Sequence, residues 1–139
     1  MESLRERMEK GLDTLIGTRL SGAAVSFQPI PGDVQVIQVV IGGREELPIF
    51  VTSSKEQILC ICYLWTDLEV IPERRAELME LLLELNPAIP LSSFGRVDGR
   101  YMLFGALSQD TRAEDIAIEI ATLSDNALDA LDALAAYLA

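Results

Sequence analysis

The stretch SSFGRVDGRYMLFGAL, residues 92–107, decides the fold that this sequence predicts. Asp98-Gly99 separates two extended runs, and Asp-Gly is a dipeptide that the type I′ turn of a β-hairpin favours. The run after the turn, Tyr101 to Leu107, is apolar at both alternating sets of positions. Strands that are covered on both faces have this pattern, whereas strands with one face in water alternate. The sequence therefore predicts a hairpin whose second strand lies at the centre of a covered sheet.

Four more extended segments precede the hairpin, and they predict the rest of the sheet. They span residues 24–30, 34–41, 48–52 and 57–65 and are separated by turns rich in glycine, proline and acidic residues. The segment 57–65 is apolar on both faces, so we expect both of its faces to be covered as well.

Three helical regions complete the predicted fold. An apolar stripe predicts the first over 4–16, with a capping box at Ser3 and Glu6. The second runs from about Pro72 to Asn86, because proline favours the first helical position and Pro87 prevents continuation.

The third helical region follows Thr111, which forms a second predicted capping box with Glu114. Ser124-Asp125-Asn126 favours a break or a kink in it. The order of elements predicts an α+β fold, in a single domain over 1–139. It has a largely antiparallel sheet of about five to six strands, an N-terminal helix, a middle helix and one or two C-terminal helices.

Composition narrows the function. The chain has 139 residues, a formal net charge of −11 and no histidine. Without histidine it lacks the usual general base near pH 7 and the commonest zinc ligand, and its negative charge disfavours nucleic acid and anionic membranes as partners. We therefore expect no catalytic residue, no cofactor and no metal ligand. The charged N-terminus is unlike a signal peptide, and no apolar run is long enough to span a bilayer, which favours a cytoplasmic protein.

The two cysteines, Cys60 and Cys62, lie two residues apart in a predicted strand and so point to the same face. Their neighbours are large and apolar, so both are predicted to be buried and reduced. Two thiolates without histidine make a poor zinc site.

The C-terminal segment is the candidate interaction element. After Arg112 it carries six carboxylates and no lysine or arginine, and its apolar stripe continues almost to the last residue. These features suit self-association into a homodimer or docking of a basic partner protein. The simpler alternative, a helix that covers the sheet with its acids in water, stays open. The candidate partner-binding residues are Glu114, Asp115, Ile118, Asp129, Leu131, Asp132, Leu134 and Leu138.

Several segments resemble the YjfI-type family of small uncharacterised bacterial proteins, over nearly the whole chain. They are ELPIF (46–50), QILC (57–60), LNP (85–87), LSSF (91–94) and GALS (105–108). The order of elements also resembles the type III secretion chaperone-like fold. That resemblance implies a cytoplasmic, often dimeric, protein-binding module without catalytic residues. YjfI-type proteins resemble genomic companions of phage-shock-protein-A-like membrane-remodelling proteins, which implies a role in envelope stress through a protein partner.

Three functions therefore stand at this point. A non-catalytic protein-interaction or chaperone-like module is favoured. A small-molecule-binding regulatory domain comes second, because a helix-covered sheet can hold an apolar pocket. An enzyme that works without histidine comes third.

Overall fold

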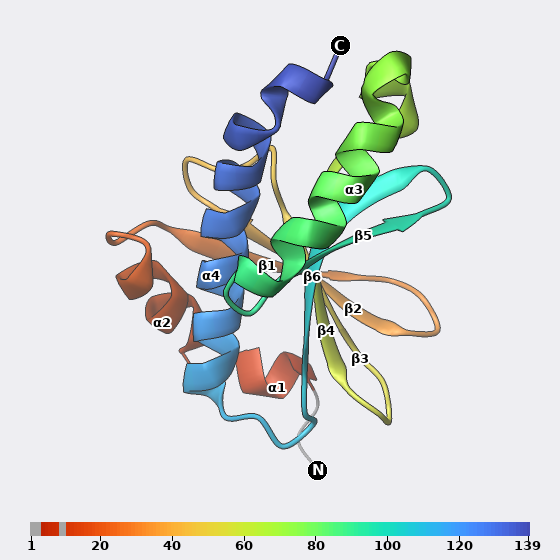
Figure 1. The fold of residues 1–139 in the computed structure, drawn as a ribbon. Helices are drawn as coiled ribbons and strands as arrows, with labels where there is room; N and C mark the ends of the chain where they lie inside the picture. The colour runs from red at the N-terminus through yellow and green to blue at the C-terminus, as the bar shows by residue number, and fades with distance from the viewer. Residues whose placement is uncertain (1–3, 9–10) are drawn as a thin grey trace.

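The computed structural model describes residues 4–8 and 11–139 of the chain. Six strands form one open antiparallel sheet in the order β1-β2-β3-β4-β6-β5, which confirms the predicted α+β class (Figure 1). The strands are β1 (Val25–Ile30), β2 (Gln35–Ile41), β3 (Ile49–Ser53), β4 (Ile58–Thr66), β5 (Ser93–Val97) and β6 (Arg100–Leu107).

The hairpin of β5 and β6 has the predicted turn. Val97 pairs with Arg100, and the two residues between them have positive φ angles, 50° at Asp98 and 75° at Gly99. A type I′ turn requires positive φ at both central positions. Strand β6 lies between β4 and β5, so the second strand of the hairpin is interior, as predicted.

The N-terminal helical region differs from the prediction. Instead of one helix over 4–16, the structure has α1 (Leu4–Met8) and α2 (Leu12–Arg19). Gly11 precedes α2 with a φ of 83°, a left-handed conformation that a continuous α-helix does not contain. The capping box predicted at Ser3 lies outside the described residues.

The middle helix, α3 (Arg75–Leu85), lies inside the predicted range. A 3₁₀ turn, η2 (Pro72–Arg74), leads into it, and a second, η3 (Asn86–Ala88), ends it at the predicted proline.

The last helix, α4, is continuous over Ala113–Ala133, so the predicted break at 124–126 is wrong. Polar residues favour helix ends when their side chains bond the local backbone, but here tertiary partners occupy them. Arg44 donates to Ser124 Oγ at 2.9 Å and to Asp125 Oδ1 at 2.8 Å, and Asn126 donates to the Pro90 carbonyl at 2.9 Å. The predicted cap is wrong too, because the N-cap is Arg112, without a side-chain cap bond.

The helices of the described residues lie together on one face of the sheet (Figure 1). Helix α4 packs on β4 and β6, and α2 packs on β1 and α4. The sheet positions beneath them are at most 9% exposed: Ile37, Val39, Ile41, Ile49, Val51, Ile58, Cys60, Cys62, Phe94, Tyr101 and Leu103. The expectation that β4 and β6 are covered on both faces is therefore wrong, because helices cover only one.

Candidate functional site

The helix-free side of the sheet, which we call the open face, is the main candidate for a binding surface. Antiparallel sheets with one face in water normally carry polar residues there. Here most positions are apolar, and most side chains are only partly buried. Its larger apolar residues are Ile30, Val36, Val40, Phe50, Leu59, Ile61, Tyr63, Val97, Met102 and Phe104.

Strand register brings the large side chains of the open face into contact across its centre. Phe50 pairs with Ile61, and Ile61 pairs with Phe104, which forms an apolar row over three neighbouring strands. The rings of Phe50 and Tyr63 meet edge to face with centroids 5.9 Å apart. Large contiguous apolar patches are rare on protein surfaces that stay in water. Where such a patch is exposed, it commonly marks a site at which another molecule binds.

The open face is also almost free of charge. Among its strand positions, all of which the structure describes, Arg100 is the only charged residue, and its guanidinium lies 3.6 Å from the centroid of the Tyr63 ring. The whole chain has 22 acidic and 11 basic residues. The charged residues of this acidic chain therefore lie almost entirely outside the open face.

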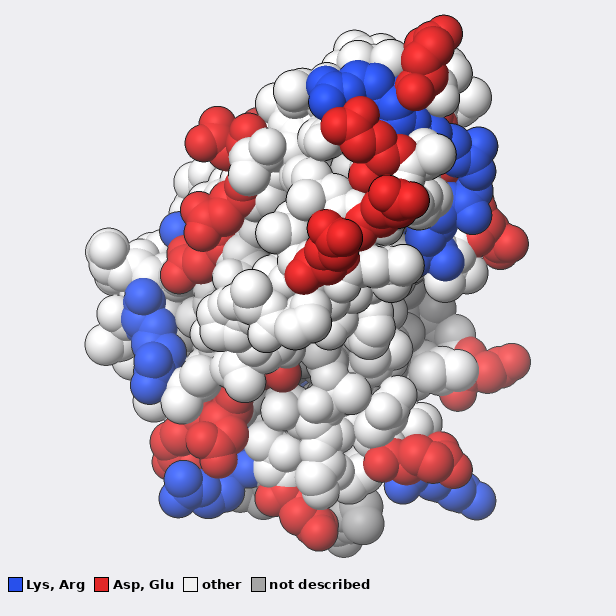
Figure 2. Space-filling view, viewed as in Figure 1, with Lys and Arg blue, Asp and Glu red and all other residues white. Residues whose placement is uncertain are grey.

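The structure does not bring the eight residues predicted to bind a partner into one surface. Glu114 and Asp115 lie in the first turn of α4, about 20 Å along the helix from Asp129. Asp129 and Asp132 are exposed near its other end, where Figure 2 shows a row of carboxylates.

The apolar members of that set lie at or near the core. Leu134 is 2% exposed, and Leu131 and Leu138 are partly buried against the core. Leu138 also forms an isolated β-bridge with Val70. Ile118 is partly exposed. The C-terminal stripe thus completes the fold, and the role of all eight residues in binding stays a prediction.

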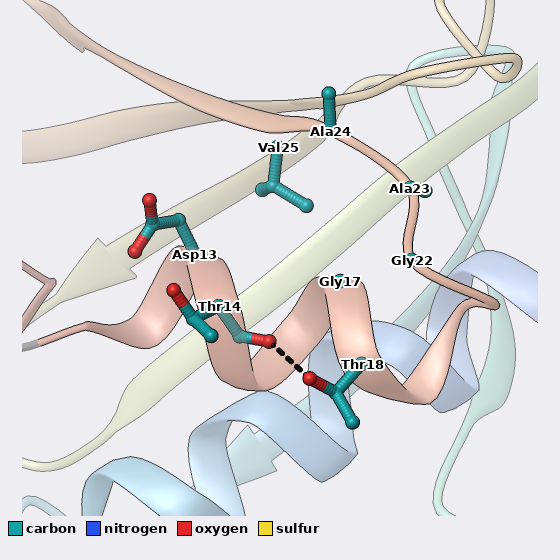
Figure 3. A pocket seen from close by; sticks show the side chains of 8 residues that line it. All are labelled: Asp13, Thr14, Gly17, Thr18, Gly22, Ala23, Ala24 and Val25. Carbon is teal, nitrogen blue, oxygen red and sulfur yellow. Dashed lines mark hydrogen bonds between the residues drawn. The ribbon is translucent and has the colours of Figure 1, made fainter.

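A cavity of about 360 Å³ lies between α2 and the start of β1 (Figure 3). Helix α2 and the segment before β1 approach closely here, since a Cβ added to Gly17 would lie 2.5 Å from the Ala23 carbonyl oxygen. Its polar side chains are Asp13, Thr14 and Thr18, and the Thr18 hydroxyl donates along the helix to the Thr14 carbonyl at 2.8 Å. Specific small-molecule sites place polar groups that converge on one ligand position, and this cavity does not.

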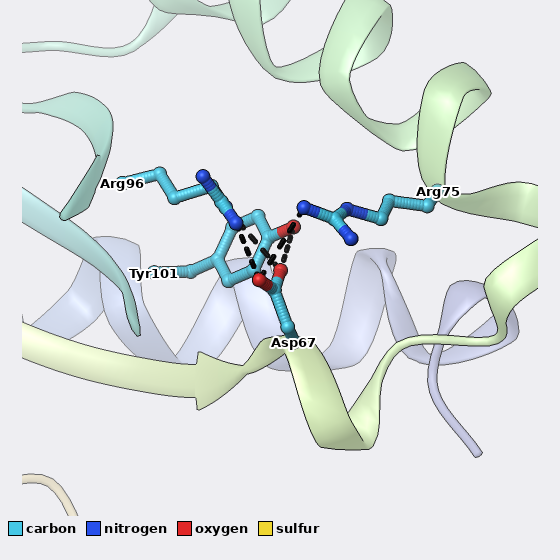
Figure 4. A network of polar contacts seen from close by, with 4 residues as sticks. All are labelled: Asp67, Arg75, Arg96 and Tyr101. Atoms are coloured by element: carbon cyan, nitrogen blue, oxygen red, sulfur yellow. Dashed lines mark hydrogen bonds and ion pairs between the residues drawn. The ribbon is translucent and has the colours of Figure 1, made fainter. Parts of the chain in front are cut away.

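Asp67, in the 3₁₀ turn η1 (Asp67–Glu69), is the centre of a network of polar contacts (Figure 4). Its carboxylate accepts hydrogen bonds from Arg96, with Nε at 3.2 Å, and from the Tyr101 hydroxyl at 2.8 Å, and it pairs with Arg75 at 3.4 Å. The bonds from Arg96 and Tyr101 hold the pKa of Asp67 below its ordinary value. An ionised carboxylate with all these partners is a structural clamp that joins β4, the hairpin and α3, and it is poorly suited to accept protons.

Glu119 is a buried acidic residue among the apolar side chains between α4 and the sheet. It lies on α4, is 3% exposed, and its Oε2 atom has no hydrogen-bond partner. Burial raises the pKa of this carboxyl group. Gly105 on β6 leaves the space that the carboxyl group fills, since a Cβ there would lie 2.7 Å from Glu119 Oε1.

Cys60 and Cys62 are free and buried, which confirms that part of the prediction. Burial raises the pKa of each thiol to about 12, and the nearby Glu119 carboxylate adds to the shift at Cys60. Thiols in this state are poor nucleophiles and poor metal ligands. No group of histidine, cysteine or acidic residues within the described part of the chain has the arrangement of a metal site. Nor does a helix there have the length and apolar character needed to cross a membrane.

Sequence reasoning missed the open face because an apolar second face has two possible causes. The apolar residues at both alternating sets in β4 and β6 predict cover on both sides. A face that binds another protein produces the same pattern. Asp67 carried no local signal, because its partners lie 8, 29 and 34 residues away.

Comparison with known proteins assigns this chain to a family. The family model described as "Uncharacterized protein conserved in bacteria (DUF2170)" matches residues 7–138. Two curated proteins, each named "Uncharacterized protein YjfI", from Escherichia coli K12 and Escherichia coli O157:H7, are 44% identical over 57 residues. The alignment covers 38% of this chain and 43% of each relative, so the chain spans less than half the length of the curated relatives it matches. These matches confirm the resemblance that the sequence segments indicated.

A solved structure described as "Crystal Structure of the ExsC-ExsE Complex" is similar in arrangement. The TM-score is 0.49 with 13% sequence identity, over 94% of this chain and 96% of that chain.

Proposed function

We propose that this chain, which belongs to the DUF2170 family of uncharacterised bacterial proteins, is a non-catalytic protein-interaction or chaperone-like module that pairs with a second copy of itself through the open face. The observation that carries this proposal is the open face itself: an apolar, nearly charge-free sheet surface on a strongly acidic chain. Burying such a surface against another protein removes it from water. This burial favours association by roughly 25 cal/mol for each Å² of apolar area.

A second copy is the occupant that the charge distribution favours. Two chains of net charge −11 repel each other wherever their carboxylates approach. On the open face they can meet with no carboxylate at a strand position of either copy. A two-fold axis through such a face joins identical patches, which is the commonest geometry of homodimers, and sheets pack face to face at about 10 Å.

The proposal also includes the location of the protein and a second partner class. We propose that the protein acts in the cytoplasm and that residues 1–139 form a single domain. A phage-shock-protein-A-like protein is the partner class that the YjfI resemblance implies. A small-molecule-binding role gains no support from the cavity beside α2, because its polar groups do not converge on a ligand position.

Sedimentation velocity over a range of protein concentrations tests the proposal. We expect the wild-type chain to be a dimer and the Ile61→Lys variant to be a monomer, because the lysine would place a charge at the centre of the buried interface. Leu83→Lys is the matched control: Leu83 is 72% exposed on α3, away from the open face, and its variant should remain a dimer. A cooperative thermal unfolding transition for each variant would verify that the variant is folded. A monomeric wild type, or a dimer that survives Ile61→Lys, would contradict the proposal.

A further inference from the structure

A groove between α3 and α4 is the second surface that the fold leaves without a partner. Its floor and walls come from the end of α3 and the loop after η3, from β5, and from the C-terminal half of α4. Phe94, Ala130 and Leu134 are buried at its base, and Leu85 and Ile89 form one wall. Asn126 fixes the loop against α4 by donating to the Pro90 carbonyl at 2.9 Å and to Ser92 Oγ at 3.0 Å.

The groove holds a volume of about 250 Å³ and is mostly apolar. That volume is below the roughly 300–1,000 Å³ of sites that enclose small molecules. It is suited to receiving one or two apolar side chains from a segment that lies along the surface.

Acidic residues lie on both helices that border the groove, and one of them, Asp129, is part of its lining. Figure 2 shows two rows of acidic residues, one over α3 and one over α4, with uncharged surface between them. The rows consist of Glu77, Glu80 and Glu84 on α3, and of Asp125, Asp129 and Asp132 on α4. Neither wall carries a basic residue, since residues 76–95 and 113–139 contain no lysine or arginine.

Two of these six carboxylates are already neutralised. Glu77 pairs with Arg74 at 3.3 Å, and Asp125 pairs with Arg44 at 2.8 Å. Within the described ranges, no ion pair engages Glu80, Glu84, Asp129 or Asp132. Four carboxylates without an ion pair therefore lie on the two helices that border an apolar groove.

We infer that the α3–α4 groove binds a basic amphipathic helix of a partner protein. An apolar anchor on that helix would enter the groove over Phe94 and Ala130. Lysine or arginine side chains on the flanks of the anchor would reach the two rows of carboxylates. Grooves between helices commonly bind partners in this way, and opposite charge on the rims increases the association rate and fixes the orientation. The inference rests on the proposed protein-binding role but not on the open face.

Direct binding of a synthetic peptide to the full chain tests the inference. The probe is a fluorescent peptide of about 18 residues, with leucine and lysine in amphipathic helical spacing. A peptide of the same composition with scrambled spacing, and a leucine–glutamate peptide with the original spacing, are the comparison probes. We expect the first to bind and both comparisons to bind at least about tenfold more weakly.

Three variants locate the binding site. Asp129→Lys reverses a charge on the groove wall, and Ala133→Trp fills the groove without changing charge; each should weaken binding by about tenfold or more. Glu56→Lys makes the same charge change in the turn between β3 and β4, far from the groove, and should weaken binding by no more than about twofold.

Three results would overturn the inference. One is that the amphipathic basic peptide binds no better than the scrambled one. Another is that Asp129→Lys and Glu56→Lys weaken binding equally, since net charge alone would then explain it. The third is that Ala133→Trp leaves the affinity unchanged. The Ile61→Lys variant, assayed with the same peptide, separates the two proposals, because it should lose self-association and keep peptide binding.

Discussion

The two faces of the sheet are both apolar, yet they differ in how their side chains are covered. On the helix side, positions such as Cys60 and Leu103 are 0% exposed, and one carboxyl group, Glu119, is enclosed with them. On the open face, the neighbouring positions Ile61 and Phe104 are only partly buried, and no carboxylate occurs at a strand position. The comparison teaches that the same apolar pattern occurs on a face that helices cover and on a face that the described part of the chain leaves open. The pattern alone does not identify what covers a face.

The largest expected difference between the faces is in the cost of removing a large side chain. Leu103→Ala on the covered face should lower the free energy of unfolding by about 3 kcal/mol, because it leaves a cavity under α4. Ile61→Ala on the open face should lower it by about 1 kcal/mol or less when measured on monomeric protein, since that side chain is only partly enclosed. Urea unfolding at low protein concentration measures both. Equal losses would show that the open face is packed as tightly as the core.

Glycines on the two faces give a second contrast. Gly105→Ala should cost about 2 kcal/mol, because the new Cβ would lie 2.8 Å from the Leu91 backbone oxygen, and a backbone atom cannot easily move away. Gly95→Ala on the open face meets the ring of Phe104 at 3.0 Å, and that partly exposed side chain can shift. We expect its cost to be about 1 kcal/mol or less. If Gly95→Ala proves the more destabilising of the two in the same urea assay, this description of the covered face is incorrect.

Glu119 sharpens the contrast through pH. Burial raises its pKa in the folded protein above the ordinary value of 4.5. Between those two values the folded state binds more protons than the unfolded state, so this carboxyl group lowers stability as pH rises through that window. Glu119→Gln should therefore stabilise the protein by about 1 kcal/mol at pH 7, with little difference well below pH 4.5, where the carboxyl group is protonated in both states. A gain that does not change between the two pH values would show that the charge of Glu119 is not its cause.

Local signals predicted most of the fold. The Asp98-Gly99 turn indicated one hairpin, extended runs between turn residues located all six strands to within a residue or two, and Pro72 and Pro87 bounded the middle helix. These signals could not predict which faces of the sheet the helices cover or the order of the strands in the sheet. The hairpin turn places β6 beside β5, but nothing local requires β4 to be the other neighbour of β6, because that pairing joins residues far apart in the chain.

The errors in the helices have the same origin. Residues 124–126 have the composition of a helix break, and they stay helical because Arg44 and Pro90, distant in sequence, bond their side chains. Burial within the C-terminal stripe also depends on distant contacts: Leu134 is buried in the core of this chain, and the role of the stripe in binding a partner stays a prediction. The sequence indicated the acidic C-terminal segment but not the α3–α4 groove, because the rest of the groove lining comes from segments that the sequence does not place beside α4.

The most direct test of the central claim is the reactivity of a single thiol placed on the open face. Cys60 and Cys62 are buried with thiol pKa values of about 12, so they should stay silent while the protein is folded. The Thr52→Cys variant places a new thiol on the open face, and Leu83→Cys places one on the exposed side of α3. We predict that alkylation of Thr52→Cys slows as protein concentration rises and dimers form, while alkylation of Leu83→Cys keeps a constant rate. If both rates are independent of protein concentration, the open face is not the surface at which two copies meet.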